Sequence, residues 1–381
     1  MKAGDFDVII IGAGPAGSCA AFTAAKQGVS VLLLEEHPEI GVPLACAEGL
    51  SRSTIKGYLE IKSEWISQEL SGGIIRGPDG EEFRVEYPNV GWILNRKIFD
   101  PALAKIAEAN GAVIKTSARA IGIEDNEVIV SELGSPHRYK FKFLISADGV
   151  VSKVGKWLGI DTRLNLGEIV VCAQYLVENI KIDAQYIYLI FGEDYAPGSY
   201  AWIFPKSETS ANIGLGISPL RTKKSARYFL DQWTGKEFCH GKIKEMAFSG
   251  VPAKILEQFS GKNFFLIGDA ARFTDPLSGA GIANAIKSGI IAGRNVVLRL
   301  KGKKDYFEPE IKKEIINEIK FHSRVHNVYL KLNDKEYKEI FKIGRKIFEG
   351  KKVSDVNMHH LVKDIVLSSP RLLRLGLNIL F

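Results

Sequence analysis

The sequence predicts an α/β fold that opens with a Rossmann-like nucleotide-binding unit. Three observations indicate it: the motif GAGPAG at residues 12–17, an apolar run at 8–11 before it, and a second apolar run at 31–34 after an alanine-rich stretch. A strand, a helix and a second strand in this order are typical of a parallel sheet covered by helices. With 381 residues, the chain is long enough for about two domains.

Each part of this opening has a physical role. Residues 8–11 predict a buried strand, Gly12 makes a tight turn, and Gly14 lets a pyrophosphate approach the backbone. Gly17 allows the following helix to pack closely on the strand, and Gly28 ends that helix. The free N–H groups at the start of the helix favour phosphate. The cofactor-binding residues expected in this loop are Gly12, Ala13, Gly14, Ala16 and Gly17.

The second apolar strand ends in two acidic residues, Glu35 and Glu36. Glu35 follows Gly17 by 18 residues, a position where a carboxylate accepts hydrogen bonds from a ribose hydroxyl. An acid here disfavours a 2′-phosphate, so NADP is not expected at this site. The opening therefore predicts a dinucleotide site for a cofactor with an unphosphorylated ribose.

A second signature, NFFLIGDAARFTDPLSGAGIANAIKSG, occupies residues 263–289. It predicts a strand over 264–267, a loop rich in proline and glycine, and a helix from about Gly281. Asp269 at the strand end can hold a polyol hydroxyl, and the helix N-terminus at Gly281 and Ile282 favours negative charge. A reduced flavin carries such charge, so the signature suits a flavin cofactor.

Three motifs together resemble the FAD-dependent family that includes the aromatic hydroxylases, the flavin halogenases and the geranylgeranyl reductases: GAGPAG, SADGVVSKVGKWLG and GDAARFTDPLSGAG. The resemblance implies FAD as the cofactor, a cofactor contact from Arg96 in LNRKIFDPALA, and backbone near Ala120 against the adenine. It also implies a discontinuous FAD-binding domain. We expect residues 1–60, 90–155 and 255–300 in that domain, residues 61–89 and 156–254 in an inserted antiparallel substrate-binding sheet, and residues 301–381 in a C-terminal helical segment.

The segment GVPLACAEGLS, residues 41–51, resembles the P-x-x-C-[GA]-E-G segment of the archaeal geranylgeranyl reductases, where a cysteine lies near the flavin. The resemblance places Cys46, Ala47 and Gly49 against the cofactor. A free cysteine by itself is most often a small buried hydrophobe. A thiol can also donate a proton, so Cys46 is the candidate catalytic residue. Glu48 is either a second candidate acid or a solvated loop carboxylate.

The segment YAWIFPK, residues 200–206, resembles a further motif of these reductases. Tyr200, Trp202 and Phe204 alternate along a predicted strand and therefore share one face. That face is either ordinary sheet core or, as the resemblance implies, a substrate-binding wall for a long isoprenoid chain. Flavin halogenases carry a segment similar to YAWIFPK. A different motif, SKVGKWLG, favours the reductases, because aromatic hydroxylases usually have arginine where this chain has Gly155.

The resemblance implies a flavin-dependent enzyme that hydrogenates C=C bonds of geranylgeranyl chains in archaeal membrane lipid biosynthesis. One alternative is an FAD-dependent monooxygenase of the aromatic hydroxylase type. Another is a non-enzymatic flavoprotein that binds a membrane surface or RNA, which only the basic tail supports. The electron donor stays open between ferredoxin, NAD(P)H and another reductant.

The charge of the chain is concentrated at its C-terminal end. Residues 301–381 hold 18 Lys and Arg against 11 Asp and Glu, and this segment alone accounts for the formal net charge of +7. It is either a solvated helical face or a peripheral contact to an anionic membrane, to which Lys363, Arg371 and Arg374 would contribute. Pro370 interrupts the final apolar stretch. We expect no nucleic-acid partner.

The four cysteines are widely separated and form no CxxC pair, which argues against a zinc site and a disulfide framework. His359 and His360 are adjacent and therefore do not share a helix face, so we expect no metal. The apolar run at 8–11 follows Met1 without a secretory n-region, and no apolar run is long enough to span a bilayer. A cytoplasmic location, with peripheral membrane contact as an option, is expected.

Overall fold

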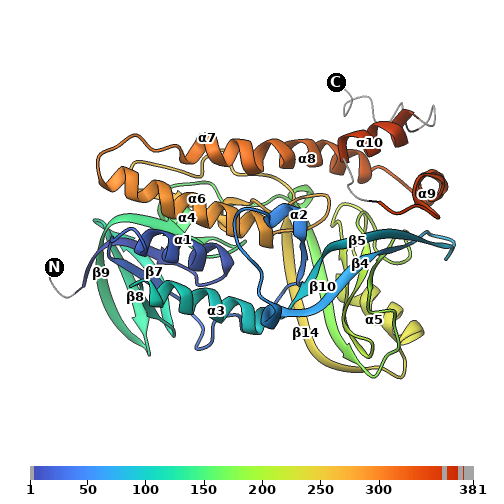
Figure 1. Ribbon diagram of the computed structural model, residues 1–381, viewed down its shortest axis with the longest axis horizontal. Helices are drawn as coiled ribbons and strands as arrows, with labels where there is room; N and C mark the ends of the chain where they lie inside the picture. Colours follow the sequence, from blue (N-terminus) through green and yellow to red (C-terminus); the bar gives the residue numbers. More distant parts are fainter. Residues whose placement is uncertain (1–3, 354–357, 368–371, 373–381) are drawn as a thin grey trace.

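Two β-sheets lie side by side in the computed structural model, which describes residues 4–353, 358–367 and 372 (Figure 1). The first sheet contains seven strands in the order β6-β2-β1-β9-β8-β7, with β15 also paired to β9. Its bounds are β1 Asp5–Ile11, β2 Val31–Leu34, β6 Val113–Lys115, β7 Ala118–Glu124, β8 Glu127–Glu132, β9 Ser135–Ser146 and β15 Phe264–Leu266.

The central strands of the first sheet are parallel, and helices cover the sheet, as is typical of parallel sheets. β1 pairs in parallel with β2 and β9, and β15 pairs in parallel with β9. Val8, Ile9 and Ile10 have no exposed surface, as expected for a strand buried on both faces. The β7-β8-β9 portion is an antiparallel meander.

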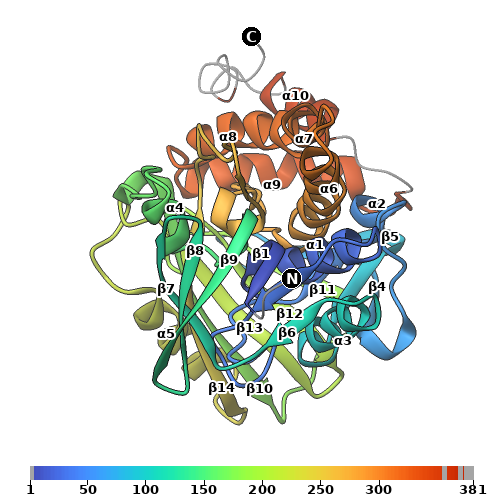
Figure 2. The same ribbon diagram turned by 90° about the vertical axis from the view of Figure 1, so that its left-hand side faces the viewer.

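Helix α1 (Pro15–Ala25) packs directly on α6 (Ile282–Leu300), and both cover the first sheet (Figure 2). The two helices approach closely because glycine faces alanine. A Cβ on Gly289 would lie 2.3 Å from the Ala16 oxygen, and one on Gly293 would lie 2.6 Å from the Ala20 oxygen. α3 (Arg96–Ala109) packs against the other side of α1.

The second sheet has eight strands in the order β14-β10-β13-β12-β11-β4-β5-β3. All pairings are antiparallel except β11 with β4, which departs from the purely antiparallel sheet expected. α5 (Ala226–Glu237) covers one face, where Leu230 and Trp233 pack in one core with Tyr175. The strands are β3 Gly49–Ser51, β4 Ile66–Arg76, β5 Glu82–Leu94, β10 Ile169–Glu178, β11 Tyr186–Ile190, β12 Ala201–Ser207, β13 Ser210–Ile217 and β14 Lys242–Pro252.

The remaining helices are short connectors or belong to the C-terminal segment. α7 and α8 run along α6 on the outside of the molecule, and α9 and α10 follow beyond them (Figure 1). No helix in the described part of the chain is long and apolar enough to cross a membrane. The bounds are α2 Arg52–Ile55, η1 Ser63–Trp65, α4 Lys153–Trp157, η2 Leu166–Glu168, η3 Gly268–Ala271, α7 Phe307–Ile311, η4 Lys312–Ile316, α8 Asn317–Tyr329, α9 Asp334–Phe348 and α10 Met358–Leu367.

The domain division stays a proposal, but the strands indicate where its boundaries should move. Every strand of the first sheet lies within 1–60, 90–155 or 255–300. Two parts of the second sheet fall outside the segments expected for it, namely β3 and the last residues of β5. β3 pairs with the end of β5, since Gly49 lies opposite Ile93. We therefore propose that both belong to the substrate-binding sheet.

Candidate functional site

The glycine loop combines two positions that require glycine for packing with one that is open. A Cβ on Gly12 would lie 2.3 Å from the Ala147 oxygen, and one on Gly17 would lie 1.8 Å from the Gly12 oxygen. A Cβ on Gly14 would meet no atom within 4 Å. Gly14 is the N-cap of α1 and no described side chain caps that helix. The loop therefore leaves space and free N–H groups for a phosphate.

Glu35, at the end of β2, holds this loop from the side. Its Oε2 accepts the Ala13 N–H at 2.9 Å, and its Oε1 accepts the His37 N–H at 3.0 Å and contacts His37 Nδ1 at 2.7 Å. An ionised carboxylate has about four acceptor sites, so Glu35 can also accept a ribose hydroxyl. Its position agrees with the expected ribose contact, which stays a proposal.

The start of β7 lies beside the end of β2. The Ala118 N–H donates to the backbone oxygen of Glu35 at 2.8 Å. Ala120 is half-buried and packs against the hydrophobic core of the first sheet. Glu36 and Arg119 form an exposed ion pair at 3.4 Å beside them. Ala120 therefore lies two residues along β7 from the strand's bond to Glu35, and Glu36 is exposed; the cofactor contacts expected of both residues stay predictions.

The second signature brings Asp269 beside the start of α6. Asp269 Oδ1 accepts the Thr274 hydroxyl at 2.5 Å, and a Cβ on Gly281 would lie 3.3 Å from the same oxygen. Gly281 is the N-cap of α6, and Ile282 is its first residue. No side chain in the described ranges caps this end of the helix. The free N–H groups and the helix dipole therefore make it a site for negative charge.

Cys46 lies in a loop that touches the second sheet at three points. Gln174 Nε2 donates to the Cys46 oxygen at 2.9 Å, and Asn212 Nδ2 donates to the Ala47 oxygen at 3.3 Å. A Cβ on Gly49 would lie 2.7 Å from the Phe204 ring, so Gly49 is needed where the loop meets the sheet. Cys46 itself is half-buried.

Arg96 begins α3 directly beside Cys46. Its guanidinium donates to both Asp100 oxygens, at 3.1 and 2.6 Å, in a mostly buried pair. Burial lowers the pKa of Arg96, but Asp100 and the Cys46 sulfur raise it above its usual value, so the group stays charged. Arg96 therefore places a fixed positive charge at the Cys46 thiol, rather than on the surface.

The aromatic motif on β12 connects the two loops. Tyr200 OH donates to the Ser278 oxygen at 2.5 Å in the loop before α6. Trp202 Nε1 donates to Gln174 Oε1 at 3.1 Å, and Gln174 in turn holds Cys46. Phe204 lies against Gly49. The expected substrate-binding face is therefore also the surface that positions the Cys46 loop and the start of α6.

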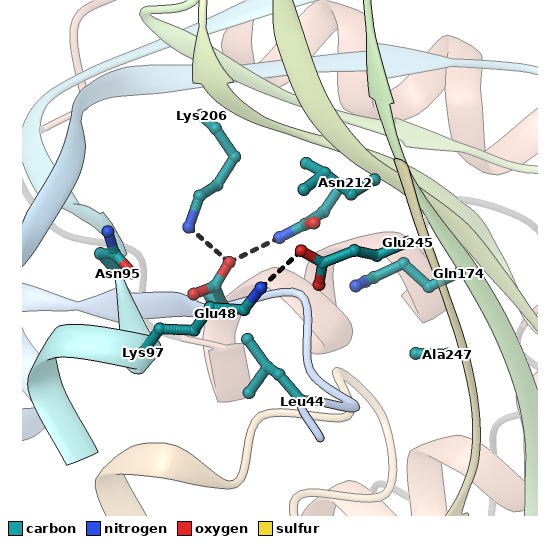
Figure 3. A pocket seen from close by; sticks show the side chains of 10 residues that line it. Leu44, Glu48, Asn95, Lys97, Gln174, Lys206, Asn212, Glu245 and Ala247 are labelled. Carbon is teal, nitrogen blue, oxygen red and sulfur yellow. Dashed lines mark hydrogen bonds and ion pairs between the residues drawn. The ribbon is translucent and has the colours of Figure 1, made fainter. Parts of the chain in front are cut away.

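Glu48 is fixed at the centre of a polar cluster (Figure 3). Its Oε2 accepts Lys206 Nζ at 2.5 Å and Asn212 Nδ2 at 2.8 Å, and its Oε1 accepts the Arg96 N–H at 2.8 Å. Glu48 is 3% exposed and adopts φ 69°, a strained conformation for this residue. It is not a solvated loop carboxylate, because three hydrogen bonds fix it between α3 and the second sheet.

A cavity of about 180 Å³ adjoins this cluster. Lys97 on α3 and Glu245 on β14 form an ion pair across it (Figure 3). The pair connects a helix packed on α1 with a strand of the second sheet. The remaining lining is part apolar and part polar. The lining residues are Leu44, Glu48, Asn95, Lys97, Gln174, Leu176, Lys206, Asn212, Glu245 and Ala247.

Sequence relatives decide the family. The digeranylgeranylglycerophospholipid reductase of Methanocella arvoryzae is 35% identical over 388 residues, covering 97% of this chain and 98% of that protein. The protein of the same name from Methanosarcina acetivorans is 45% identical over 301 residues, covering 76% of this chain and 74% of that protein. The chain belongs to the geranylgeranyl reductase family. Residues 168–251 match the geranylgeranyl reductase catalytic domain, and residues 7–107 match the FAD-dependent oxidoreductase domain.

Solved structures agree with this family and fold. A geranylgeranyl bacteriochlorophyll reductase-like protein from Thermoplasma acidophilum has a TM-score of 0.90 at 27% identity, covering 98% of this chain and 99% of that chain. A flavin-dependent brominase has a TM-score of 0.66 at 18% identity, which shows the shared fold alone. The predictions of FAD as cofactor and of a flavin-dependent oxidoreductase are confirmed for this member of the geranylgeranyl reductase family.

The residues present fit FAD at both ends of the site. We propose that the glycine loop, Glu35 and the backbone at Ala120 hold the nucleotide end. Asp269, Gly281, Ile282 and the Cys46 loop would hold the flavin end, with Ala13 and Ala16 supplying small side chains where the loop and helix pack. No cluster among the described residues offers three or more His, Cys, Asp or Glu ligands to a metal.

We expect Gly14→Val to weaken FAD binding without unfolding this family member. Gly14 has φ −67° and ψ −175°, which valine adopts readily, and the space at its Cβ is open. The unfolding free energy of the apoprotein should change by about 0.5 kcal/mol or less. The dissociation constant for FAD should rise more than about tenfold, because the side chain occupies the pyrophosphate approach.

Fluorescence titration of apoprotein with FAD and urea unfolding measure the two effects. Gly17→Val is the matched control, since its Cβ would lie 1.8 Å from a backbone oxygen and should destabilise the fold itself. An unchanged FAD affinity in a folded Gly14→Val variant would contradict the placement of the pyrophosphate.

Several residues of the site were not identified from the sequence. Lys206 stood in the quoted motif YAWIFPK without a role, and Asn212 interrupts the apolar run of β13. A polar residue inside an apolar strand is an available signal for a buried hydrogen-bonded group. Gln174 gives the same signal in β10.

Cys172, unlike the half-buried Cys46, is buried. Burial raises the pKa of its thiol to about 12, so it is an inert core residue.

Proposed function

We propose that this protein reduces C=C bonds of geranylgeranyl chains on archaeal-type membrane lipid precursors. One observation carries the proposal: the cysteine loop and the start of α6 meet the same aromatic strand. Tyr200 contacts Ser278, and Phe204 contacts Gly49. The family relatives are named as reductases of digeranylgeranylglycerophospholipid, which supports an isoprenoid lipid as the substrate.

FAD, when bound in its reduced form, supplies a hydride. Addition of hydride to one alkene carbon leaves the other carbon in need of a proton. Cys46 is the proton donor that the geometry favours, because its thiol is half-buried and lies beside the Arg96 guanidinium. After Cys46 gives up its proton, the thiolate is stabilised by that positive charge. Glu48 keeps the loop in place through its bonds to Lys206 and Asn212.

An unactivated alkene resists reduction, so the site must position it closely and exclude water. Trp202, Phe204 and Tyr200 provide apolar surface at the two loops. Burial of an isoprenoid chain is worth about 0.8 kcal/mol per CH₂. We propose that these three side chains bind the part of the isoprenoid chain next to Cys46.

We also propose an electron donor and a membrane contact. A net positive charge suits an acidic protein donor such as a ferredoxin, and NAD(P)H is the alternative. The basic segment 301–381 would contact the membrane that holds the lipid. Lys363 lies on α10 and is exposed, whereas Pro370, Arg371 and Arg374 lie outside the described residues.

An anaerobic lipid assay tests the proposal. Dithionite-reduced protein is incubated with a geranylgeranylated glycerophospholipid, and the lipid is analysed by mass spectrometry. Gains in steps of about two mass units, one for each hydrogenated double bond, are expected. An unchanged lipid with reduced FAD bound would contradict the reductase. Oxygen uptake with an aromatic or polyene substrate would then support the monooxygenase alternative.

A further inference from the structure

A buried acid–base pair links the C-terminal helical segment to the loop before α6. Asp275 lies in that loop, here called the α6 entry loop (residues 275–281), and His322 lies on α8. Nδ1 of His322 contacts Oδ2 of Asp275, and the two residues are 7% and 8% exposed. A buried ionic pair is costly unless its groups are well satisfied, so this one calls for an explanation.

Asp275 folds the α6 entry loop on itself. Its Oδ1 accepts the N–H groups of Leu277 and Ser278, at 2.9 and 2.8 Å. The backbone N–H of Asp275 donates to the backbone oxygen of Ala280 at 3.0 Å, and the backbone oxygen of Asp275 accepts the Gly279 N–H at 2.9 Å. Asp275 therefore determines where the loop ends and where the uncapped N-terminus of α6 begins.

The α6 entry loop is held from two other parts of the molecule. Tyr200 of the second sheet donates to the Ser278 oxygen at 2.5 Å. His322 of the C-terminal segment contacts Oδ2 of Asp275, whereas the loop N–H groups donate to Oδ1. Since FAD would place its negatively charged reduced ring at the start of α6, an uncompensated Asp275 carboxylate nearby would oppose reduction.

The surrounding groups favour an ionic form of the pair. Burial lowers the pKa of His322, but the hydrogen bond and charge of Asp275, with Glu318, raise it above its usual value. Burial raises the pKa of Asp275, but His322 and the two loop N–H groups bring it below its usual value. His326 on α8 and Tyr200 also face Asp275; burial lowers the pKa of His326 and raises that of Tyr200, so both are neutral.

We propose that His322 is a positioning residue for the flavin: as a cation it neutralises and orients Asp275, so that the start of α6 favours the reduced cofactor. The inference rests on the proposed placement of the flavin at Gly281 and Ile282. It gives the C-terminal helical segment a defined part in the site. The charge is present below the raised pKa of His322 and is lost as the pH rises through that pKa.

The midpoint potential of bound FAD, measured between about pH 6 and pH 9 without isoprenoid, tests the proposal. The wild-type plot of potential against pH should bend at the pKa of His322. H322N keeps a hydrogen-bond donor without the charge. Its plot should lack the bend due to His322, whereas any bend from protonation of the reduced flavin itself remains. Below the pKa of His322, its preference for reduced over oxidised FAD should fall about tenfold, equal to about 30 mV for a two-electron couple.

Two further variants separate charge from shape. D275N/H322N removes both charges and keeps a neutral pair, so its low-pH potential should return close to the wild-type value without the bend due to His322. H326N is the control on the same helix and should keep the wild-type bend. A bend at the pKa of His322 that persists in H322N or in D275N/H322N would overturn the proposal. Because no isoprenoid is present, loss of lipid reduction beside a normal bend would count against the proposed function alone.

Discussion

Replacing Cys46 with alanine is expected to lower the rate of double-bond reduction by about 10²–10⁴-fold, the contribution typical of a positioned proton donor. Cys46 is half-buried in the loop against the aromatic strand, and its thiol lies beside a fixed cation, Arg96. Cys46→Ser should remain strongly impaired, because a hydroxyl is a far weaker acid than a thiol. FAD binding should be retained, since Cys46 contributes one small side chain to the flavin end.

Single-turnover kinetics measure this effect directly. Reduced enzyme is mixed anaerobically with geranylgeranylated lipid, and reoxidation of the flavin is followed by its absorbance. Cys239→Ser is the matched control, because Cys239 is exposed and lies in the connection between α5 and β14. Full turnover by a Cys46→Ala variant that retains FAD would rule out Cys46 as the proton donor and return attention to a water in the adjoining cavity.

How much of the structure can be predicted from the sequence depends on how far apart along the chain the interacting residues are. The order β1-α1-β2 was predicted, and β2 has its predicted bounds, because the glycine motif and the apolar strands are local signals; β1 begins three residues earlier than predicted, and α1 ends at Ala25, before Gly28. The flanking motif makes Cys46 a candidate, whose catalytic role stays a prediction, and alternation predicts the strand β12. The Glu48–Lys206 contact spans 158 residues, and the Asp275–His322 contact spans 47. Nothing local marks such pairs, because only the packing of the two sheets and the C-terminal helices brings them together.

The domain boundaries show the same limit. β5 continues for several residues past position 90, because its end pairs with β3, which follows the Cys46 loop in the chain. The sequence shows an apolar run there, but an apolar run does not say which sheet will pair with it. The role of Glu48 was missed for a similar reason: whether a loop carboxylate is solvated or buried depends on Lys206 and Asn212, which come from the inserted sheet.

Replacing Lys206 with methionine is expected to destabilise the protein by about 3–5 kcal/mol, because it leaves the Glu48 carboxylate buried without its cation. Lys206 Nζ also donates to the Leu94 oxygen at 2.8 Å, so the same change loosens the end of β5. Urea unfolding of the apoprotein measures the loss. Arg163→Met, which breaks the exposed pair with Asp161, is the control and should leave stability close to that of the wild type.

A second substitution distinguishes charge from packing. In E48Q/K206M the buried charge is gone, and the single glutamine oxygen can still accept one of the two remaining donors, the Asn212 amide or the Arg96 N–H. Most of the lost stability should therefore return, as it does when both members of a buried pair are replaced by neutral groups. If the double variant is as unstable as Lys206→Met alone, the lysine acts through its stem and its bond to Leu94 rather than through Glu48. If stability returns but lipid reduction does not, the ion pair serves to hold the Cys46 loop in its reactive position.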